Sequence, residues 1–313
     1  MTSPDPQAPL SDDAAATRCA ITLVGFGEVG QVLADDLLAG GQSDITVYDI
    51  AFADPQSAPS RAAAQRAVRR ADNAAQAGAR ADLVICAVTA AADLEAARAV
   101  AAGIAGGAFY VDLNSASPGS KQQAAALVDA AGGRYVEAAV MAPIDPRRIA
   151  SVMLLGGPHA QALQPLLHRL GFVGSQVFAD TVGPASATKM CRSVIIKGVE
   201  ALLTESMLAA RHYGVEQVVL DSLSDLLPIG DWPRLARYMI SRSVEHGVRR
   251  AEEMREVSHT LSEAGVSAWM TDACVTRQSW APRHKAALEH PALGEMLDAM
   301  RATPTKSLEE KPR

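Results

Sequence analysis

The chain has 313 residues, of which 49% are apolar and 4% aromatic, and its net charge at pH 7 is −6. This length allows two domains with a full core, and the negative charge excludes the electrostatic footprint of a nucleic-acid partner. No apolar run approaches the roughly 20 residues that span a bilayer. Residues 1–17 have neither a basic start nor an apolar centre, so we expect a loose tail rather than a secretory signal. Four scattered cysteines without a C-x-x-C pair predict a reducing cytoplasm and no metal site.

The first strong motif is Gly25-Phe26-Gly27-Glu28-Val29-Gly30, which fits the pattern Gly-x-Gly-x-x-Gly. The apolar run 20–24 predicts a strand before it and the run 31–38 a helix after it, which is the context of a dinucleotide-binding turn. The glycines allow a tight turn, close approach of the backbone to a pyrophosphate and close helix–strand packing. The helix N-terminus offers free N–H groups to the phosphates. We therefore predict that these six residues bind the cofactor; the alternative is an ordinary glycine-rich turn.

Asp49 ends the next predicted strand, 44–49, and lies 19 residues after Gly30. At this place in a βαβ unit an acidic side chain accepts hydrogen bonds from the adenosine ribose. It would repel the 2′-phosphate of NADP, and the following residue is Ile50 rather than an arginine, so NAD is favoured over NADP. Two alternatives remain open: an ordinary aspartate that begins a turn, and an arginine that folds back onto a phosphate from the downstream set Arg61, Arg66, Arg69 and Arg70.

Strands and helices alternate through the first half of the chain. The apolar run 82–88, in which we expect Cys86 to be a buried thiol, predicts a parallel strand that brings Val88 and Thr89 to the cofactor at the carboxyl edge of the sheet. The strand 109–113 brings Asn114, Ser115 and Ala116 to the same edge, where we expect substrate contacts. Further helices are predicted at 90–105, 121–131 and 158–170, and strands at 134–140, 151–157 and 176–178. This order predicts an α/β protein with a Rossmann-type, doubly wound, mostly parallel sheet.

The second half has almost no strand signal. It begins with a long predicted helix, 184–213, which Gly214 stops and which connects the two parts of the chain. Shorter helices are predicted at 215–226, 231–245, 248–263, 267–279 and 283–300. We therefore divide the chain into a tail (1–17), an NAD-binding domain (18–182), an all-α substrate and dimerisation domain (183–302) and a second tail (303–313). Helices of this kind leave apolar faces that a second subunit covers, so we expect a homodimer.

A polar patch lies near the start of the long helix. At about 100° per residue, Lys189, Arg192 and Ser193 share one side of the first turns. Ile195, Val199, Leu202 and Leu203 lie on the opposite side and predict a core stripe. The patch is either the wall of a cleft or a solvated face, and the helix alone does not decide between them.

Four segments, in order and spacing, resemble the β-hydroxyacid dehydrogenase family, which includes 3-hydroxyisobutyrate dehydrogenases and 6-phosphogluconate dehydrogenase. Residues 25–30 resemble its cofactor motif, and 112–118 its substrate motif Asp-x-Ser-Thr-x-x-Pro. Residues 137–143 stand in the place of Asp-Ala-Pro-Val-Ser-Gly-Gly. Residues 183–193 resemble Gly-x-Gly-x-x-x-Lys-x-x-x-Asn, which puts Lys189 on the catalytic lysine.

The chain departs from the family pattern at several places. Asn114 replaces the serine of the substrate motif, and Ser193 replaces the asparagine one turn after the lysine. Met141-Ala142-Pro143 replaces the Ser-Gly-Gly turn that holds a substrate carboxylate. The later Lys-Asp segment is replaced by a stretch that begins at His246. The pattern resembles a divergent branch of the family with its own C-terminal helical domain.

The resemblance implies an NAD-dependent dehydrogenase that oxidises the secondary alcohol of a hydroxy acid, a small and anionic substrate. Lys189 would be the general acid/base, its pKa lowered by burial and by Arg192. Ser193 would orient the substrate oxygen, and Asn114, Ser115 and Ala116 would bind polar groups. The anionic end of the substrate would be held by Arg192, His246, Arg249 or Arg250. The alternatives are an NADPH-dependent imine reductase of the same fold and a non-catalytic nucleotide-binding protein.

Overall fold

The computed structural model describes residues 19–223, 227–228 and 230–302. An eight-stranded sheet forms the first part, in the order β3-β2-β1-β4-β5-β6-β7-β8. Neighbouring strands are parallel except β6 and β7, which are antiparallel. The strands are β1 (Ile21–Val24), β2 (Ile45–Tyr48), β3 (Arg69–Arg70), β4 (Leu83–Cys86), β5 (Phe109–Asp112), β6 (Arg134–Val140), β7 (Met153–Gly156) and β8 (Ser175–Ala179). The predicted α/β class with a mostly parallel sheet is confirmed.

Both faces of the sheet are covered, as a doubly wound fold requires. In β4, Leu83 and Ile85 join one apolar cluster, whereas Val84 and the fully buried Cys86 join another, because side chains alternate across a strand. The covering helices are α1 (Glu28–Ala39), α2 (Ala58–Ala64), α3 (Ala74–Gly78), α4 (Asp93–Ala101), α5 (Pro118–Ala130) and α6 (Ala160–Arg169), with short 3-10 turns η1 (Ile50–Ala53), η2 (Ala90–Ala92) and η3 (Arg148–Ala150). In open α/β sheets, ligands bind outside the carboxyl ends of the parallel strands.

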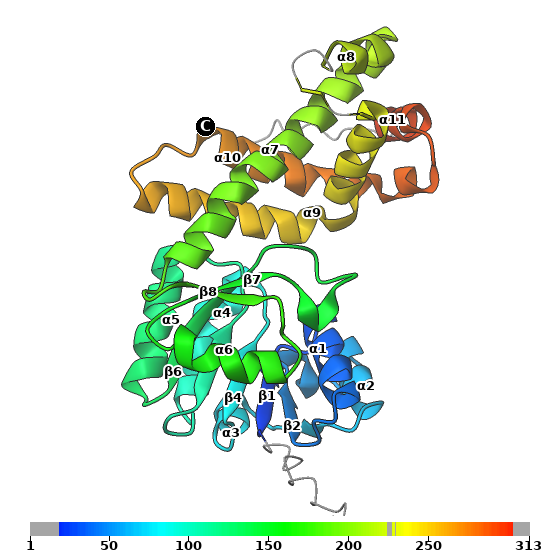
Figure 1. Cartoon of the computed structure of the whole chain (residues 1–313). Helices are drawn as coiled ribbons and strands as arrows, with labels where there is room; N and C mark the ends of the chain where they lie inside the picture. Colours follow the sequence, from blue (N-terminus) through cyan, green and yellow to red (C-terminus); the bar gives the residue numbers. More distant parts are fainter. Residues whose placement is uncertain (1–18, 224–226, 229, 303–313) are drawn as a thin grey trace, which may run out of the picture.

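The second part is helical (Figure 1). It consists of α7 (Pro184–Tyr213), α8 (Glu216–Leu223), α9 (Trp232–Glu263), α10 (Trp269–Trp280), η4 (Ala281–Glu289) and α11 (Leu293–Ala302). The long helix α7 has the predicted bounds; it rises from the sheet domain, and α9 lies across the top of that domain (Figure 1). None of the helices within the described ranges has the length and hydropathy needed to cross a membrane.

Two helix predictions in this part are wrong. Helices predicted at 231–245 and 248–263 are the single helix α9. Gly247 does not break it; a Cβ there would collide with the Gln278 carbonyl oxygen and lie 2.7 Å from the Pro282 ring, so this glycine allows close packing. The single helix predicted at 283–300 is instead η4, with non-helical dihedral angles at His284, followed by α11. The tails and residues 224–226 lie outside the described residues.

The predicted core stripe of α7 is also wrong in part. Leu203 is 7% exposed, but Ile195 is 67% and Leu202 57% exposed. The side of α7 that carries the buried Ser193 contacts α9 instead. The buried side of α7 is therefore mixed: Ser193 and Glu200 are buried together with Met190, Leu203 and Met207, whereas Ile195 and Leu202 face solvent.

Candidate active site

The glycine turn between β1 and α1 is shaped for a ligand with a phosphate backbone. Gly25 has a φ of 90°, and a Cβ there would collide with the Ala87 carbonyl oxygen, as one at Gly30 would with that of Gly25. No atom lies within 4 Å of a Cβ built on Gly27, which is the N-cap of α1. This open glycine at a helix N-terminus fits the approach of a pyrophosphate.

Asp49 ties the end of β2 to the glycine turn. Its Oδ2 accepts a hydrogen bond from the Phe26 N–H at 2.7 Å, and its Oδ1 accepts one from the Ala51 N–H at 2.8 Å. Because each carboxylate oxygen has two acceptor positions, both contacts leave room for ribose hydroxyls. Of the downstream arginines, Arg66 pairs with Asp35 and Arg69 with Asp44, each at 2.7 Å.

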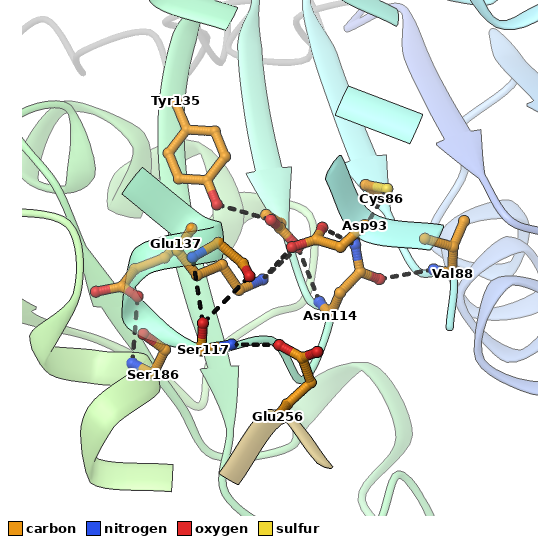
Figure 2. Close-up of polar contacts among 12 residues, drawn as sticks. Cys86, Val88, Asp93, Asn114, Ser117, Tyr135, Glu137, Ser186 and Glu256 are labelled. Atoms are coloured by element: carbon orange, nitrogen blue, oxygen red, sulfur yellow. Dashed lines mark hydrogen bonds and ion pairs between the residues drawn. The ribbon is translucent and has the colours of Figure 1, made fainter. Parts of the chain in front are cut away.

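The loops after β4 and β5 are joined by the buried side chain of Asn114 (Figure 2). Its Oδ1 accepts from the Val88 N–H at 2.7 Å, and its Nδ2 donates to Asp93 at 2.7 Å and lies 3.3 Å from the sulfur of Cys86. Asn114 therefore fixes the backbone that follows β4, and its amide is already used by protein groups.

Glu137 in β6 caps the start of α7. Its carboxylate accepts from the N–H groups of Gly183 at 2.7 Å and Ala185 at 3.1 Å. It also accepts from the Ser186 N–H at 3.2 Å (Figure 2). An anion that accepts several N–H groups at the positive end of a helix is stabilising. This cap fixes where α7 begins and hence the height of Lys189 above the sheet.

Lys189 is half-buried in a narrow crevice at the carboxyl edge of the sheet. Burial lowers its pKa to about 8; Lys197, Lys121 and Arg249 act in the same direction, and Glu253 opposes them. A lysine with this pKa exchanges its proton near neutral pH, as a general acid/base must. The crevice is lined by Asn114, Lys121, Glu137, Ala138, Ala139, Ser186, Lys189 and Met190.

Helix α9 contributes charged side chains that act on the pKa of Lys189. Glu253 pairs with Lys197 at 2.9 Å and with Arg249 at 2.7 Å, and Lys197 also donates to Ser193 at 3.1 Å. Burial would raise the pKa of Glu253, but Lys197, Arg249 and Lys189 outweigh it and hold that pKa at about 2. Glu253 is therefore a permanent anion beside the lysines.

The same helix reaches both predicted binding loops. Glu256 accepts from the Ser117 N–H at 2.9 Å, at the start of α5. Farther along, burial and Arg242 lower the pKa of His246; Glu245 of the same helix opposes this shift, and Glu28 of the glycine turn does so to a smaller extent. Helix α9 also contacts η2, so it reaches from the loop after β5 to the loop after β4.

Comparison with known proteins agrees with this geometry. Residues 20–183 match the family described as the NAD binding domain of 6-phosphogluconate dehydrogenase, and residues 210–281 match a domain of unknown function, DUF1932. The chain belongs to the 6-phosphogluconate dehydrogenase-type NAD-binding family. The resemblance seen in the sequence is confirmed, and with it a nucleotide-binding first domain of the oxidoreductase type.

Solved structures extend the likeness over both parts of this family member. A conserved hypothetical protein from Sinorhizobium meliloti 1021 is 33% identical, with 91% of this chain and 97% of that one covered and a TM-score of 0.70. The conserved protein MTH1747, of unknown function and described as structurally similar to 3-hydroxyacid dehydrogenases, is 28% identical, with 90% and 98% covered and a TM-score of 0.66. A Mycobacterium tuberculosis 3-hydroxyisobutyrate dehydrogenase with L-serine shares the fold at 17% identity, 91% and 99% coverage and a TM-score of 0.67.

The residues singled out in the sequence lie partly in the crevice and partly outside it. Lys189 and Asn114 line the same crevice, and Ser193 accepts a hydrogen bond from Lys197, which pairs with Glu253 of α9. Arg192 is exposed on the flank of α7. His246 lies on α9, and Glu28 of the glycine turn is among the groups that affect its pKa. Ser115 is half-buried and Ala116 buried in the loop after Asn114, whereas Val88 and Thr89 follow β4.

Three residues that structure the site were not singled out. Glu137 lay within a motif segment but looked like an ordinary strand residue, and Lys121 stood at the start of the helix predicted at 121–131. Glu253 belongs to a charged stretch in which four of the six residues 249–254 are charged, so no single member stood out. The sequence has no pattern that identifies such partners. They can be recognised only once the fold shows which charged groups lie around a buried lysine.

Proposed function

We propose that the chain is an NAD-dependent dehydrogenase that oxidises the secondary alcohol of a hydroxy acid, with Lys189 as general acid/base. The observation that carries this proposal is the half-buried Lys189 with a pKa of about 8, in a crevice next to Asn114. An ordinary lysine with a pKa near 10.4 is too basic for this exchange at neutral pH. Family membership supports the oxidoreductase class.

The glycine turn and Asp49 would hold the cofactor, with Val88 and Thr89 at the edge of the sheet. When bound, NAD supplies the hydride acceptor, and the protein supplies geometry and proton transfer. The neutral amine of Lys189 takes the proton of the substrate hydroxyl as its carbon loses a hydride, and the ammonium returns it in the reverse direction. Ser193 orients the substrate oxygen, because its hydroxyl is held in place by Lys197.

The charges of the cleft support an anionic substrate. Lys189, Lys197 and Arg249 face the single carboxylate of Glu253 from α7 and α9. Arg249 is more than half exposed while paired with Glu253, so its remaining donors are available to a carboxylate. His246 and Arg192 lie farther along the two helices, and we assign them, with Ser115 and Ala116, to the outer end of the substrate.

The test is Lys189→Met. The variant should bind NAD as the original chain does and lose at least about two orders of magnitude in turnover, the scale of general acid–base catalysis. Turnover is followed by the absorbance of reduced nicotinamide on a panel of hydroxy acids, with NAD and NADP in parallel. The control is Lys285→Met, a change of an exposed lysine on η4. Near-normal turnover of Lys189→Met would remove Lys189 from the mechanism.

The same panel separates the alternatives. Activity on imines with NADPH and none on hydroxy acids would make the protein an imine reductase. Tight NAD binding without turnover on either panel would make it a nucleotide-binding protein.

We further propose that the chain forms a homodimer along α7 and works in the cytoplasm. Its four cysteines are free, which fits a reducing compartment. The outer face of α7 carries exposed, uncharged residues over most of its length: Cys191, Ile195, Leu202, Ser206, Ala209 and Tyr213. An uncharged face of this kind fits a second copy of the chain.

A further inference from the structure

A second lysine lies beside Lys189 in the crevice. Lys121, on α5, is 1% exposed, and both lysines line this crevice. Its Nζ lies 2.5 Å from Oδ1 of Asp112 and 3.8 Å from Oδ2 of Asp93. Lysines are almost never fully buried unless they are paired, and this one is placed at the proposed reaction centre rather than at the surface.

The pair of aspartates keeps Lys121 charged. Burial alone would lower its pKa, but Asp112 and Asp93 outweigh burial and raise the pKa above its ordinary value. Both aspartates are held in turn: Asp112 accepts from the Tyr135 hydroxyl at 2.7 Å, and Asp93 accepts from Asn114 at 2.7 Å (Figure 2). Lys121 is thus a fixed ammonium over the whole physiological pH range.

Lys189 experiences charges from every element around it. Two carboxylates and three cations face it: Glu253 and Arg249 on α9, Glu137 on β6, Lys197 on α7 and Lys121 on α5. Among the cations, Lys197 and Arg249 are paired directly with Glu253, and the side chain of Arg249 is 57% exposed. Lys121 differs because it is fully enclosed, where water and salt screen its charge least.

We propose that Lys121 is a positioning residue of the site: its buried ammonium disfavours a second positive charge on Lys189 and so keeps that amine available as a base. This inference rests on the proposed function for its catalytic meaning. The effect of one charge on the other involves only Lys121, Lys189 and the two aspartates that pair with Lys121.

A substitution of Asp93 provides a second test of how the charge of Lys121 affects Lys189. Burial raises the pKa of Asp93 to about 7, so its neutral form is populated near physiological pH. Asp93→Asn has the shape of that neutral form and removes one negative charge that offsets Lys121. It should therefore act on Lys189 in the opposite direction to removal of the Lys121 charge.

The experiment measures the titration of Lys189 directly. The whole chain without cofactor is acetylated by acetic anhydride at a series of pH values, and mass spectrometry gives the labelling of Lys189 relative to the exposed Lys285. Lys121→Gln, which keeps a donor for Asp112, should move the midpoint of Lys189 upward by about half a pH unit or more. Asp93→Asn should move it downward, and Lys121→Arg should leave it within about 0.2 pH unit.

Opposite shifts in Lys121→Gln and Asp93→Asn support the inference, because a purely structural role of the network would not reverse sign. Midpoints that stay at the original value, or move together, overturn it. If circular dichroism shows that Lys121→Gln does not fold, the direction of the Asp93→Asn shift decides. Labelling needs no turnover, so loss of the proposed function and loss of this inference are separate results.

Discussion

The Nζ of Lys197 on α7 lies 2.9 Å from Oε2 of Glu253 on α9, and this ion pair connects the two long helices beside Lys189. Both side chains are at least 85% buried in this pair, so solvent screens them little. The pair has two effects: it anchors Ser193 through Lys197, and it places a fixed anion near the proposed acid/base.

Glu253→Gln should shift the pH dependence of turnover to lower pH. The Glu253 carboxylate raises the pKa of Lys189, so its removal lowers that pKa below about 8. Loss of the partner of Lys197 adds in the same direction, because an uncompensated ammonium then lies near Lys189. In the oxidative direction the rising limb of kcat/KM against pH should therefore begin earlier. Glu289→Gln, at an exposed position on η4, is the control and should leave the limb unchanged.

Lys189→Met should stabilise the protein at neutral pH even as it removes activity. The pKa of Lys189 is lowered in the folded chain, so the unfolded chain binds more protons between pH 8 and about 10.5. Below pH 8 the original chain carries the full cost of a buried ammonium, and that cost is relieved as the pH rises. The stability advantage of the variant, measured by urea unfolding, should therefore shrink between pH 8 and about 10.5. A pH-independent difference would contradict the burial of this amine.

The sheet domain was predictable because its signals are local. Continuous apolar runs such as 82–88 predict buried strands, and Gly25 to Gly30 predicts its own turn, since only glycine avoids the collisions found at Gly25 and Gly30. The helical half was less predictable because a glycine can either end a helix or allow another segment to pack closely against a continuous one. Gly247 lies between the two helices predicted at 231–245 and 248–263, yet it permits contact with Gln278 within a continuous helix.

The contacts among the residues of the site could not be predicted, because they depend on packing between elements that are distant in the sequence. Asp93, Asn114 and Lys121 come from three separate segments, and only the sheet brings them together. Likewise, hydrophobicity alone predicted that Ile195 and Leu202 form a core. In the structure Leu203 is buried, but Ile195 and Leu202 are exposed, and ions such as Lys197 and Glu253 are buried between α7 and α9 instead.

Glu137→Ala should lower the free energy of unfolding by about 2 kcal/mol or more, the scale of losing charge-assisted hydrogen bonds at a helix N-terminus. Three buried N–H groups, from Gly183, Ala185 and Ser186, would lose their acceptor. The measurement is urea unfolding near neutral pH. Glu95→Ala is the matched control, because Glu95 is an exposed acid in the first turn of α4. An equal loss in both variants would mean that Glu137 acts only through the helix dipole.

Asp49→Asn should weaken the preference for NAD over NADP by about tenfold or more, equivalent to about 1.4 kcal/mol of discrimination. The change removes the negative charge that repels a 2′-phosphate, while the remaining amide oxygen can still accept one backbone N–H. Calorimetric dissociation constants for both nucleotides give the ratio. The exposed Asp54→Asn is the control. An unchanged ratio would mean that the carboxylate of Asp49 does not set the preference.

Leu202→Glu and Ile195→Glu should convert the proposed dimer to a monomer. Both side chains are more than half exposed on the uncharged face of α7, so two copies that meet there would bury a carboxylate without a partner. Light scattering coupled to gel filtration gives the mass. The control is Val248→Glu, since Val248 is 66% exposed on α9 and lies outside that face. A dimer that persists in both α7 variants would place the contact elsewhere, and a monomeric original chain would leave the α7 face to a different partner.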